Sequence, residues 1–299
     1  MTSLTARLAA LAIRLTGRRR TLARADPDPE AAVATRARPA RPTGAQRRRF
    51  AVRWDLRDGF EVYTVAPRAG GRTGGVIYLH GGAYTSPITR IHWRFIARMV
   101  ARTGLRVTVP LYPLTPEHSC ADICALAMAV YRNRLAMDGE PPVALIGDSA
   151  GGGLALSLAM QVRDAGLPGP GGLVLISPWL DVTTNDPSQA RIEPSDVMLM
   201  RPGVRALGRW YAGDRATTDP RVSPLFGSLR GLPPIELFCG SHDILVADAR
   251  RLAALARAEA CPLAYHEEPG LMHVYPLLGL PESRRAEARI VRFLAGVRD

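Results

Sequence analysis

The sequence predicts an α/β fold in which a mostly parallel sheet is wrapped by helices. From residue 50 onward, short apolar runs alternate with helical segments, which is typical of chains built from strand and helix repeats. The middle apolar runs are almost continuous, as expected for parallel strands buried on both faces. The composition, with 47% hydrophobic and 22% charged residues among 299, is that of a globular protein and excludes a disordered or fibrous chain.

Eight strands and five helices are expected in this region. The strands are predicted at 50–55, 60–65, 75–79, 105–109, 143–147, 172–176, 235–239 and 263–267, and the helices at 90–102, 120–136, 150–165, 246–260 and 282–296. The segment 178–232 is rich in Pro, Asp and Ser and too long for a plain connection, so we expect an inserted lid with a helical stretch near 203–212. The sequence contains no visible repeat. No glycine-rich phosphate-binding loop follows any of the predicted strands.

The first 49 residues are expected to form a basic leader, and a single domain is expected at 50–299. Twelve arginines and three acids give the leader a charge of +9, so the rest of the chain carries only +3 of the total +12. A nucleic-acid-binding domain would carry this charge on a folded face, so that class is disfavoured. The leucines of segment 4–15 repeat at helical spacing, which indicates an amphipathic helix. We expect it to be part of a cap or to contact a membrane surface or another anionic partner.

The compartment is inferred from the cysteines and the apolar runs. No run approaches the ~18 residues of a membrane-spanning helix, and Arg7 and Arg14 interrupt the one that resembles a signal peptide. The four cysteines lie in apolar segments and do not have metal-site spacing, and four are too few for a disulfide scaffold. We therefore expect a cytoplasmic protein without a metal site.

The segment Gly147-Asp148-Ser149-Ala150-Gly151 carries the main chemical signal. A predicted strand precedes it and a predicted helix follows it. A serine at such a sharp strand-to-helix turn has a strained backbone, and flanking glycines leave room for the chain. The helix N-terminus favours developing negative charge. These features predict a nucleophilic Ser149.

The segment His80-Gly81-Gly82-Ala83-Tyr84 follows the strand 75–79 and suits an oxyanion hole. The tetrahedral intermediate of acyl transfer needs converging backbone N–H groups, and glycines allow the backbone to approach closely. We predict Gly81, Gly82 and Ala150 as the donors. His80 is expected to shape the loop by hydrogen bonding and to transfer no proton.

His273 is the predicted base for Ser149. In hydrolases with this serine turn, the acid and the histidine follow the serine in the chain, which excludes His92 and His118. Two other histidines are less suitable as the base, because His242 is next to an acidic residue in a loop and His266 lies within a strand of alternating polarity. His273 instead follows the strand 263–267 in a loop that can reach the serine.

Asp243 is the predicted acid that orients His273. It ends a loop directly after the strand 235–239, and ligands of open α/β sheets bind beside such carboxyl ends. The rival, Asp248, stands where a helix begins and is expected to be a capping or surface residue.

Together these residues resemble the bacterial hormone-sensitive-lipase-like family of α/β-hydrolases. The matching segments run in the family's order between residues 76 and 275: HGGAY at 80–84, YPLTPEH at 112–118, GDSAGGG at 147–153, SPWLD at 177–181, DPRVSPL at 219–225, and the segments around Asp243 and His273. The resemblance implies an α/β-hydrolase fold with a mostly parallel eight-stranded sheet, helices on both faces and a helical cap. It also implies that the enzyme hydrolyses small acyl esters without a cofactor and that Asp148 supports the oxyanion loop.

Two departures from the family pattern concern the loops. Ala83 stands where the family has a third glycine, and the family's arginine is absent from Tyr112–His118. We place the substrate pocket near Tyr84 and Trp210.

The chain is also similar to acetyl hydrolases that remove an N-acetyl group in antibiotic pathways, so an acetylated secondary metabolite is the alternative substrate to a short-chain ester.

A third function stays open, that of a small-ligand binding protein on the same fold. The family's plant hormone receptors lack the catalytic histidine, whereas His273 is present here. The expected partner is in each case a small molecule and not a nucleic acid, and a homodimer is the open alternative to a monomer.

Overall fold

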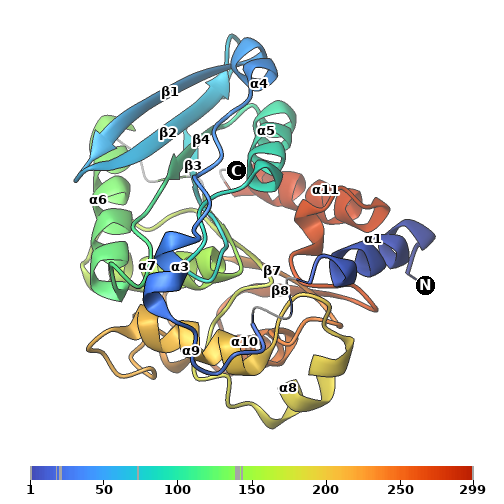
Figure 1. Cartoon of the computed structure of the whole chain (residues 1–299). Helices are drawn as coiled ribbons and strands as arrows, with labels where there is room; N and C mark the ends of the chain where they lie inside the picture. The colour runs from blue at the N-terminus through green and yellow to red at the C-terminus, as the bar shows by residue number, and fades with distance from the viewer. Residues whose placement is uncertain are drawn as a thin grey trace.

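The computed structural model describes residues 2–17, 19, 22–72, 74–138, 142 and 144–297 (Figure 1). Eight strands form one sheet in the order β1-β2-β4-β3-β5-β6-β7-β8. The β2 strand pairs antiparallel with β1 and β4, and all other neighbouring strands are parallel. The predicted mostly parallel eight-stranded sheet is confirmed.

Each predicted strand is present within two residues of its expected ends. The strands are β1 (Phe50–Arg57), β2 (Phe60–Pro67), β3 (Gly75–Leu79), β4 (Arg106–Pro110), β5 (Ala144–Asp148), β6 (Leu173–Ile176), β7 (Ile235–Gly240) and β8 (Leu263–Glu268). Val143, the first residue of the expected strand 143–147, lies outside the described residues.

The five predicted helices cover both faces of the sheet (Figure 1). They are α5 (Arg90–Thr103), α6 (Cys120–Asp138), α7 (Ala150–Asp164), α10 (Val246–Ala258) and α11 (Pro281–Gly296). Alternate residues of β3 enter two apolar clusters: Ile77 and Leu79 pack with α6, α7 and α10, whereas Val76 and Tyr78 pack with α5 and α11. The period of two along a strand therefore builds a core on each face.

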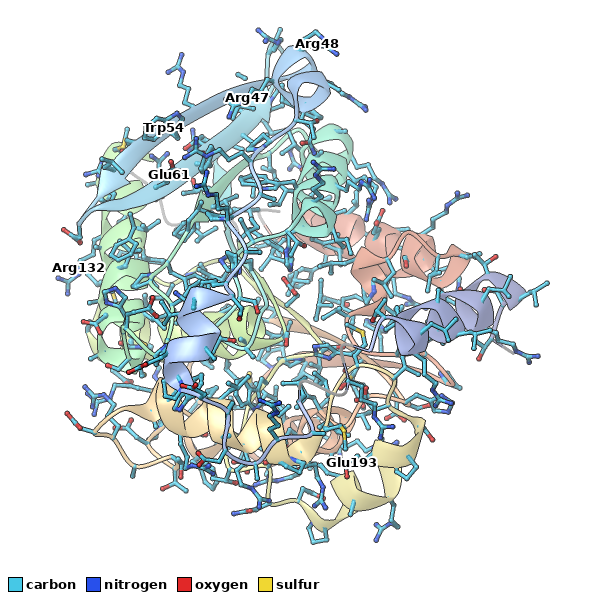
Figure 2. All side chains as sticks on the ribbon, in the orientation of Figure 1. Arg47, Arg48, Trp54, Glu61, Arg132 and Glu193 are labelled. Carbon is cyan, nitrogen blue, oxygen red and sulfur yellow. The ribbon has the colours of Figure 1, made fainter. Side chains whose placement is uncertain are left out.

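The segment expected as a lid holds short helices on the side of the carboxyl ends of the parallel strands. These are α8 (Pro187–Ile192), η1 (Glu193–Ser195), α9 (Arg201–Ala212) and η2 (Pro224–Phe226); one further turn, η3 (Tyr275–Leu277), follows β8. The helix expected near 203–212 is α9. Glu193 marks this lower part of the molecule in Figure 2.

The leader runs over the body from α1 (Leu4–Leu15) through α3 (Pro29–Ala34) to α4 (Gly44–Arg49) (Figure 1). It touches the lid, since the carbonyl oxygens of Leu22 and Ala25 accept hydrogen bonds from α9. The division into a leader at 1–49 and a domain at 50–299 stays a prediction. Its Arg18 and Arg20 lie outside the described residues.

All four cysteines are free and buried. Among the described residues, no helix is long and apolar enough to cross a membrane. Nor does this part of the chain bring three His, Cys, Asp or Glu side chains together in a way that could hold a metal ion.

Candidate active site

Ser149 occupies a tight turn between β5 and α7. Its φ of +53° lies in the left-handed region, which a residue with a side chain adopts only when the surrounding structure enforces it. A Cβ on Gly147 would collide with the Gly151 carbonyl, and one on Gly151 with the Leu79 carbonyl. The N–H of Ser149 donates to Ile176 at 2.8 Å. The two glycines and the neighbouring strand thus hold the serine at the carboxyl end of β5.

The structure brings Ser149, His273 and Asp243 together from three parallel strands. The Ser149 Oγ lies 2.9 Å from His273 Nε2, and His273 Nδ1 lies 2.8 Å from Asp243 Oδ2. Asp243 follows β7 and His273 follows β8, so the three side chains meet where these strands and β5 end. Ser149 is 9% exposed and the other two are less exposed. This is the arrangement expected for a nucleophile, a base and an orienting acid.

The surroundings set the proton positions in this triad. Burial by itself lowers the pKa of His273, but the charge of Asp243 and the hydrogen bond to it raise that pKa above its usual value. The other carboxylate oxygen of Asp243 accepts from the Leu245 N–H at 2.9 Å. In the neutral imidazole, Nδ1–H therefore donates to Asp243 and Nε2 is left to accept the Ser149 proton.

Asp248 does not reach the imidazole. It lies in the first turn of α10 and its Oδ1 is 3.4 Å from Arg251. It is also fully buried, and the N-cap position of α10 is Leu245, so the expectation of a capping or surface residue is wrong. Burial raises the pKa of Asp248 well above its usual value, and the neighbouring Arg251 acts in the opposite direction.

A second carboxylate, Asp196, lies beside the triad and was not expected from the sequence. This residue of the lid is fully buried, and it accepts hydrogen bonds from the Met198, Leu199 and Ile244 N–H groups at 2.8, 2.9 and 2.9 Å. Burial and the nearby Asp243 raise the pKa of Asp196 to about 6. Asp196 thus joins the lid to the turn that carries Asp243.

The oxyanion loop differs from the prediction in one donor. The Gly81 N–H donates to Asp148 Oδ1 at 3.0 Å, so it is not free to bind an oxyanion. In the part of the chain that the structure describes, the N–H groups of Gly82, Ala83 and Ala150 donate to no protein acceptor. Ala83 has a φ of +53°, the conformation that the family's third glycine would adopt easily. The free donors are therefore Gly82, Ala83 and Ala150, and the choice of Gly81 is corrected.

Asp148 holds this loop from below. Its Oδ1 also accepts from the Tyr78 hydroxyl at 2.5 Å, and its Oδ2 lies 3.3 Å from His92 Nε2. Burial would raise the pKa of Asp148, but His92 and these hydrogen bonds hold it below its usual value, so the group stays ionised. Neither Tyr78, which lies inside a strand, nor His92, which precedes the serine, was expected here.

His80 is a buried neutral ring. Burial and the neighbouring His92 lower the pKa of His80 to about 4, and its Nδ1–H donates to the Gly81 carbonyl at 2.8 Å. The ring stacks on Tyr112 with 4.3 Å between centroids. The expected part of His80 in shaping the loop stays a prediction, which this hydrogen bond to the loop supports.

The two expected pocket residues differ in their surroundings. Tyr84 is 1% exposed, donates to the Ala150 carbonyl at 2.7 Å and stacks on Tyr211, so it packs beneath the serine turn instead of lining an open pocket. Trp210 is half-buried on α9, within the lid. Of the two, only Trp210 is partly exposed, and its part in a substrate pocket stays a prediction.

A family model described as the alpha/beta hydrolase fold matches residues 76–277. The chain belongs to this family. It is 35% identical over 225 residues to an acetyl-hydrolase of Streptomyces hygroscopicus, which covers 73% of this chain and 74% of that protein.

Two further comparisons concern lipases. A triacylglycerol lipase of Mycobacterium tuberculosis is 37% identical over 76% of this α/β-hydrolase, but the chain spans only 47% of that longer protein. A hormone-sensitive lipase from a metagenome library superimposes with a TM-score of 0.83, at 23% identity and coverage of 98% and 99% of the two chains, which shows a shared fold. The predicted membership of the α/β-hydrolases is thus confirmed.

Proposed function

We propose that this α/β-hydrolase cleaves short-chain acyl esters through an acyl-enzyme on Ser149. The observation that carries the proposal is the continuous hydrogen-bonded line from Ser149 Oγ through His273 to Asp243. The naming of relatives as esterases and acetyl-hydrolases supports the same chemistry.

In the first half-reaction, Ser149 Oγ bonds to the acyl carbon while its proton passes to His273 Nε2. Asp243 stabilises the imidazolium that forms. The carbonyl oxygen becomes an oxyanion, and the three free N–H groups of Gly82, Ala83 and Ala150 are the donors that the loop offers it. The Nε2 proton then goes to the leaving alkoxide as the carbon–oxygen bond breaks, which leaves Ser149 acylated.

Water completes the cycle in the reverse sense. His273 takes a proton from the water, the hydroxide attacks the acyl carbon, and the proton returns to Ser149 as the acid leaves. Asp148 is proposed to act only as support: its negative charge holds Gly81 and so fixes the loop that presents the neighbouring N–H groups.

The test is a panel of p-nitrophenyl acetate, butyrate and octanoate with the wild type and Ser149→Ala. We expect kcat/KM to be highest for acyl chains of about four carbons or fewer, and to be lost in the variant. Hydrolysis by Ser149→Ala at the wild-type rate would contradict the assignment of Ser149 as the nucleophile. A preference for octanoate would contradict the short-chain assignment alone.

A second candidate is removal of an acetyl group from an amide nitrogen, such as that of an acetylated antibiotic precursor. The similarity to the Streptomyces acetyl-hydrolase favours it. An amine leaves only if His273 protonates it, so amide cleavage demands closer placement of the substrate than ester cleavage. Trp210→Ala in the lid should therefore reduce deacetylation of N-acetyl compounds more than hydrolysis of p-nitrophenyl acetate. If no N-acetyl compound is cleaved, the ester reading stands alone.

A further inference from the structure

Helix α1 turns its leucines toward solvent. Leu4, Leu8, Leu11 and Leu15 lie on one face and are 71, 58, 55 and 78% exposed. The opposite face packs on the body through three alanines and Ile13, with Ala6 fully buried. Contiguous exposed apolar patches of this kind mark interaction surfaces. The four leucines, called the leucine stripe below, are such a patch.

The orientation of α1 is fixed by polar contacts at its first turn. The N–H and the hydroxyl of Ser3 donate to the Glu282 carboxylate at 2.8 and 3.0 Å, and Glu282 is 2% exposed at the start of α11. The Thr2 hydroxyl donates to the Pro269 carbonyl at 3.2 Å. These bonds anchor the helix to the loop after β8 and to α11, so the outward direction of the leucine stripe belongs to the folded protein.

Two arginines flank one side of the leucine stripe. Arg7 and Arg14 are seven residues apart, so they lie on the same side of the helix. Within the described residues neither side chain has an ion-pair partner, whereas Arg36 and Arg41 of the same leader pair with Glu117 and Glu61. The first acidic residue of the chain is Asp26. The positive charge beside the stripe is therefore uncompensated.

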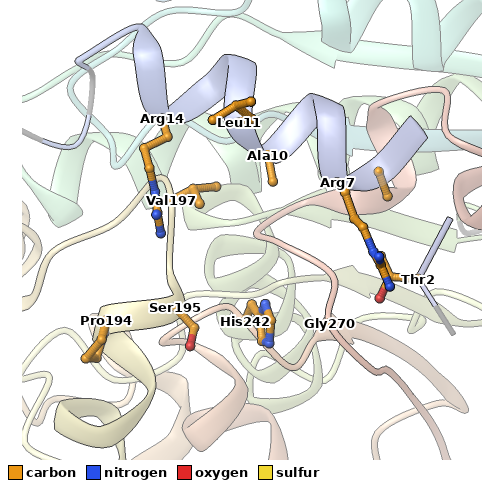
Figure 3. Close-up of a pocket in the computed structure, with 11 residues that line it drawn as sticks. Thr2, Arg7, Ala10, Leu11, Arg14, Pro194, Ser195, Val197, His242 and Gly270 are labelled. Carbon is orange, nitrogen blue, oxygen red and sulfur yellow. The ribbon is translucent and has the colours of Figure 1, made fainter. Parts of the chain in front are cut away.

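The same arginines line a cavity of about 570 Å³ under α1 (Figure 3). Arg7 and Arg14 extend from α1 along one wall, Leu11 of the leucine stripe also borders the cavity, and Ser195 and His242 lie on the opposite wall. Ser149 is not among the lining residues. An anionic group in this cavity would meet two guanidinium groups, a hydroxyl and an imidazole.

We propose that α1 docks the protein on an anionic lipid surface. The leucine stripe enters the apolar layer, and Arg7 and Arg14 bind lipid phosphates at its border. Helices with an apolar stripe beside arginines lie in the plane of such an interface, and the negative surface potential attracts them. A second copy of this chain is a poor occupant, because two leaders of charge +9 would repel each other.

The test is co-sedimentation of the full chain with vesicles of phosphatidylcholine, with and without phosphatidylglycerol. We expect binding to the mixed vesicles that weakens with salt. The double variant Leu8→Gln with Leu15→Gln should lower the partition coefficient roughly tenfold or more. Leu56→Gln is the matched control, because Leu56 is 59% exposed on the edge strand β1 and should leave binding unchanged.

The charge is tested in the same way. Arg7→Gln with Arg14→Gln should lower binding to the mixed vesicles, whereas Arg132→Gln on α6, on the other side of the molecule in Figure 2, should not. Melting temperatures establish that each variant is folded.

Three results would overturn the proposal. The first is equal binding to neutral and mixed vesicles. The second is binding that the leucine variant does not reduce, which would mean attraction by charge alone. The third is a dimer in sedimentation velocity that the leucine variant dissociates, together with no vesicle binding, which would make a second copy the occupant.

Discussion

The carboxyl ends of the strands around Ser149 and the helix α1 differ in how their polar and apolar groups are partnered. Around Ser149, the buried carboxylates of Asp148, Asp196 and Asp243 each accept at least two hydrogen bonds. On α1, the leucine stripe faces solvent and the neighbouring arginines have no ion-pair partner among the described residues. The carboxylates around Ser149 are thus hydrogen-bonded within the protein. The leucines and arginines of α1 remain available to a partner outside the chain.

The difference follows from what each region must do. Buried charges cost free energy unless they are paired, so a fully bonded network holds reacting groups in one geometry before substrate arrives. Exposed leucines and unpaired arginines cost little in water and gain only when another surface covers them. Breaking bonds in the first region should therefore cost activity, whereas substitutions on the exposed face of α1 should leave the fold intact.

The largest effect is expected at Ser149 and His273. Ser149→Ala and His273→Ala should each lower kcat on p-nitrophenyl acetate by about 10⁶, because the two side chains act as one unit. Melting temperatures should stay close to that of the wild type, since neither change removes a large core side chain. Substantial activity in either variant, measured with the same ester, would mean that the substituted residue is not required for hydrolysis.

The next effect is expected at Asp243. Asp243→Asn should lower kcat by about 10⁴, because the amide favours the wrong imidazole tautomer. Asp248→Asn is the matched control, because Asp248 is also a buried aspartate after β7 but has Arg251 as its neighbour instead of His273. A silent Asp243→Asn beside an inactive Asp248→Asn would mean that the acid has been misassigned.

A smaller loss is expected in the oxyanion loop. A Cβ on Gly81 would collide with the Asp148 carboxylate and lie 3.0 Å from Ser149 Cβ. Gly81→Ala should therefore lower kcat by about 10² to 10³, the loss typical of a disturbed oxyanion hole. Ala83→Gly keeps the N–H and suits the positive φ, so it should retain most of the activity. If Ala83→Gly is as damaging as Gly81→Ala, the collision is not the cause.

The pH profile should show the charges around His273. The base must be neutral, so kcat/KM falls as the pH drops through the pKa of His273, and this acid limb should lie above the reference value of ~6.5 because Asp243 raises that pKa. Asp196 also raises it, so Asp196→Asn should move the limb to lower pH. Serine-dependent activity that is flat down to about pH 4 would count against a histidine base.

The smallest effect is expected on α1 in the absence of lipid. Leu8→Gln should change the free energy of unfolding by no more than about 0.5 kcal/mol, because the side chain is exposed. Leu145→Ala in the fully buried β5 should cost about 2–5 kcal/mol. Urea unfolding of both variants measures the contrast, and a large loss in Leu8→Gln would mean that the leucine stripe packs against the protein.

Most of the fold was predictable because its signals are local. Apolar runs marked all eight strands, and the serine turn, the acid and the histidine each follow a strand within a few residues. Parallel strands bring their carboxyl ends to one edge, so local positions were enough to bring Ser149, Asp243 and His273 together as candidates.

The oxyanion donors and Asp196 were not predictable in this way. Whether the Gly81 N–H is free depends on the Asp148 side chain, 67 residues further along the chain. Asp196 lies in the irregular part of the lid, where neither hydrophobic period nor motif marks a residue, and its bond to Ile244 spans 48 residues. Such contacts depend on how distant segments pack together, and the sequence pattern of a single segment does not show this.

The sequence by itself determined that α1 is an amphipathic helix with leucines on one face, because helical spacing depends only on residue order. It likewise determined a strained serine turn between a strand and a helix. Only the tertiary structure decided which way these groups face. The bonds from Ser3 to Glu282 turn the leucine stripe to solvent, and the Gly81 N–H bond to Asp148 leaves Gly82, Ala83 and Ala150 as the free donors. Orientation is a property of long-range contacts, and residues 279 and 67 positions apart make the two that matter here.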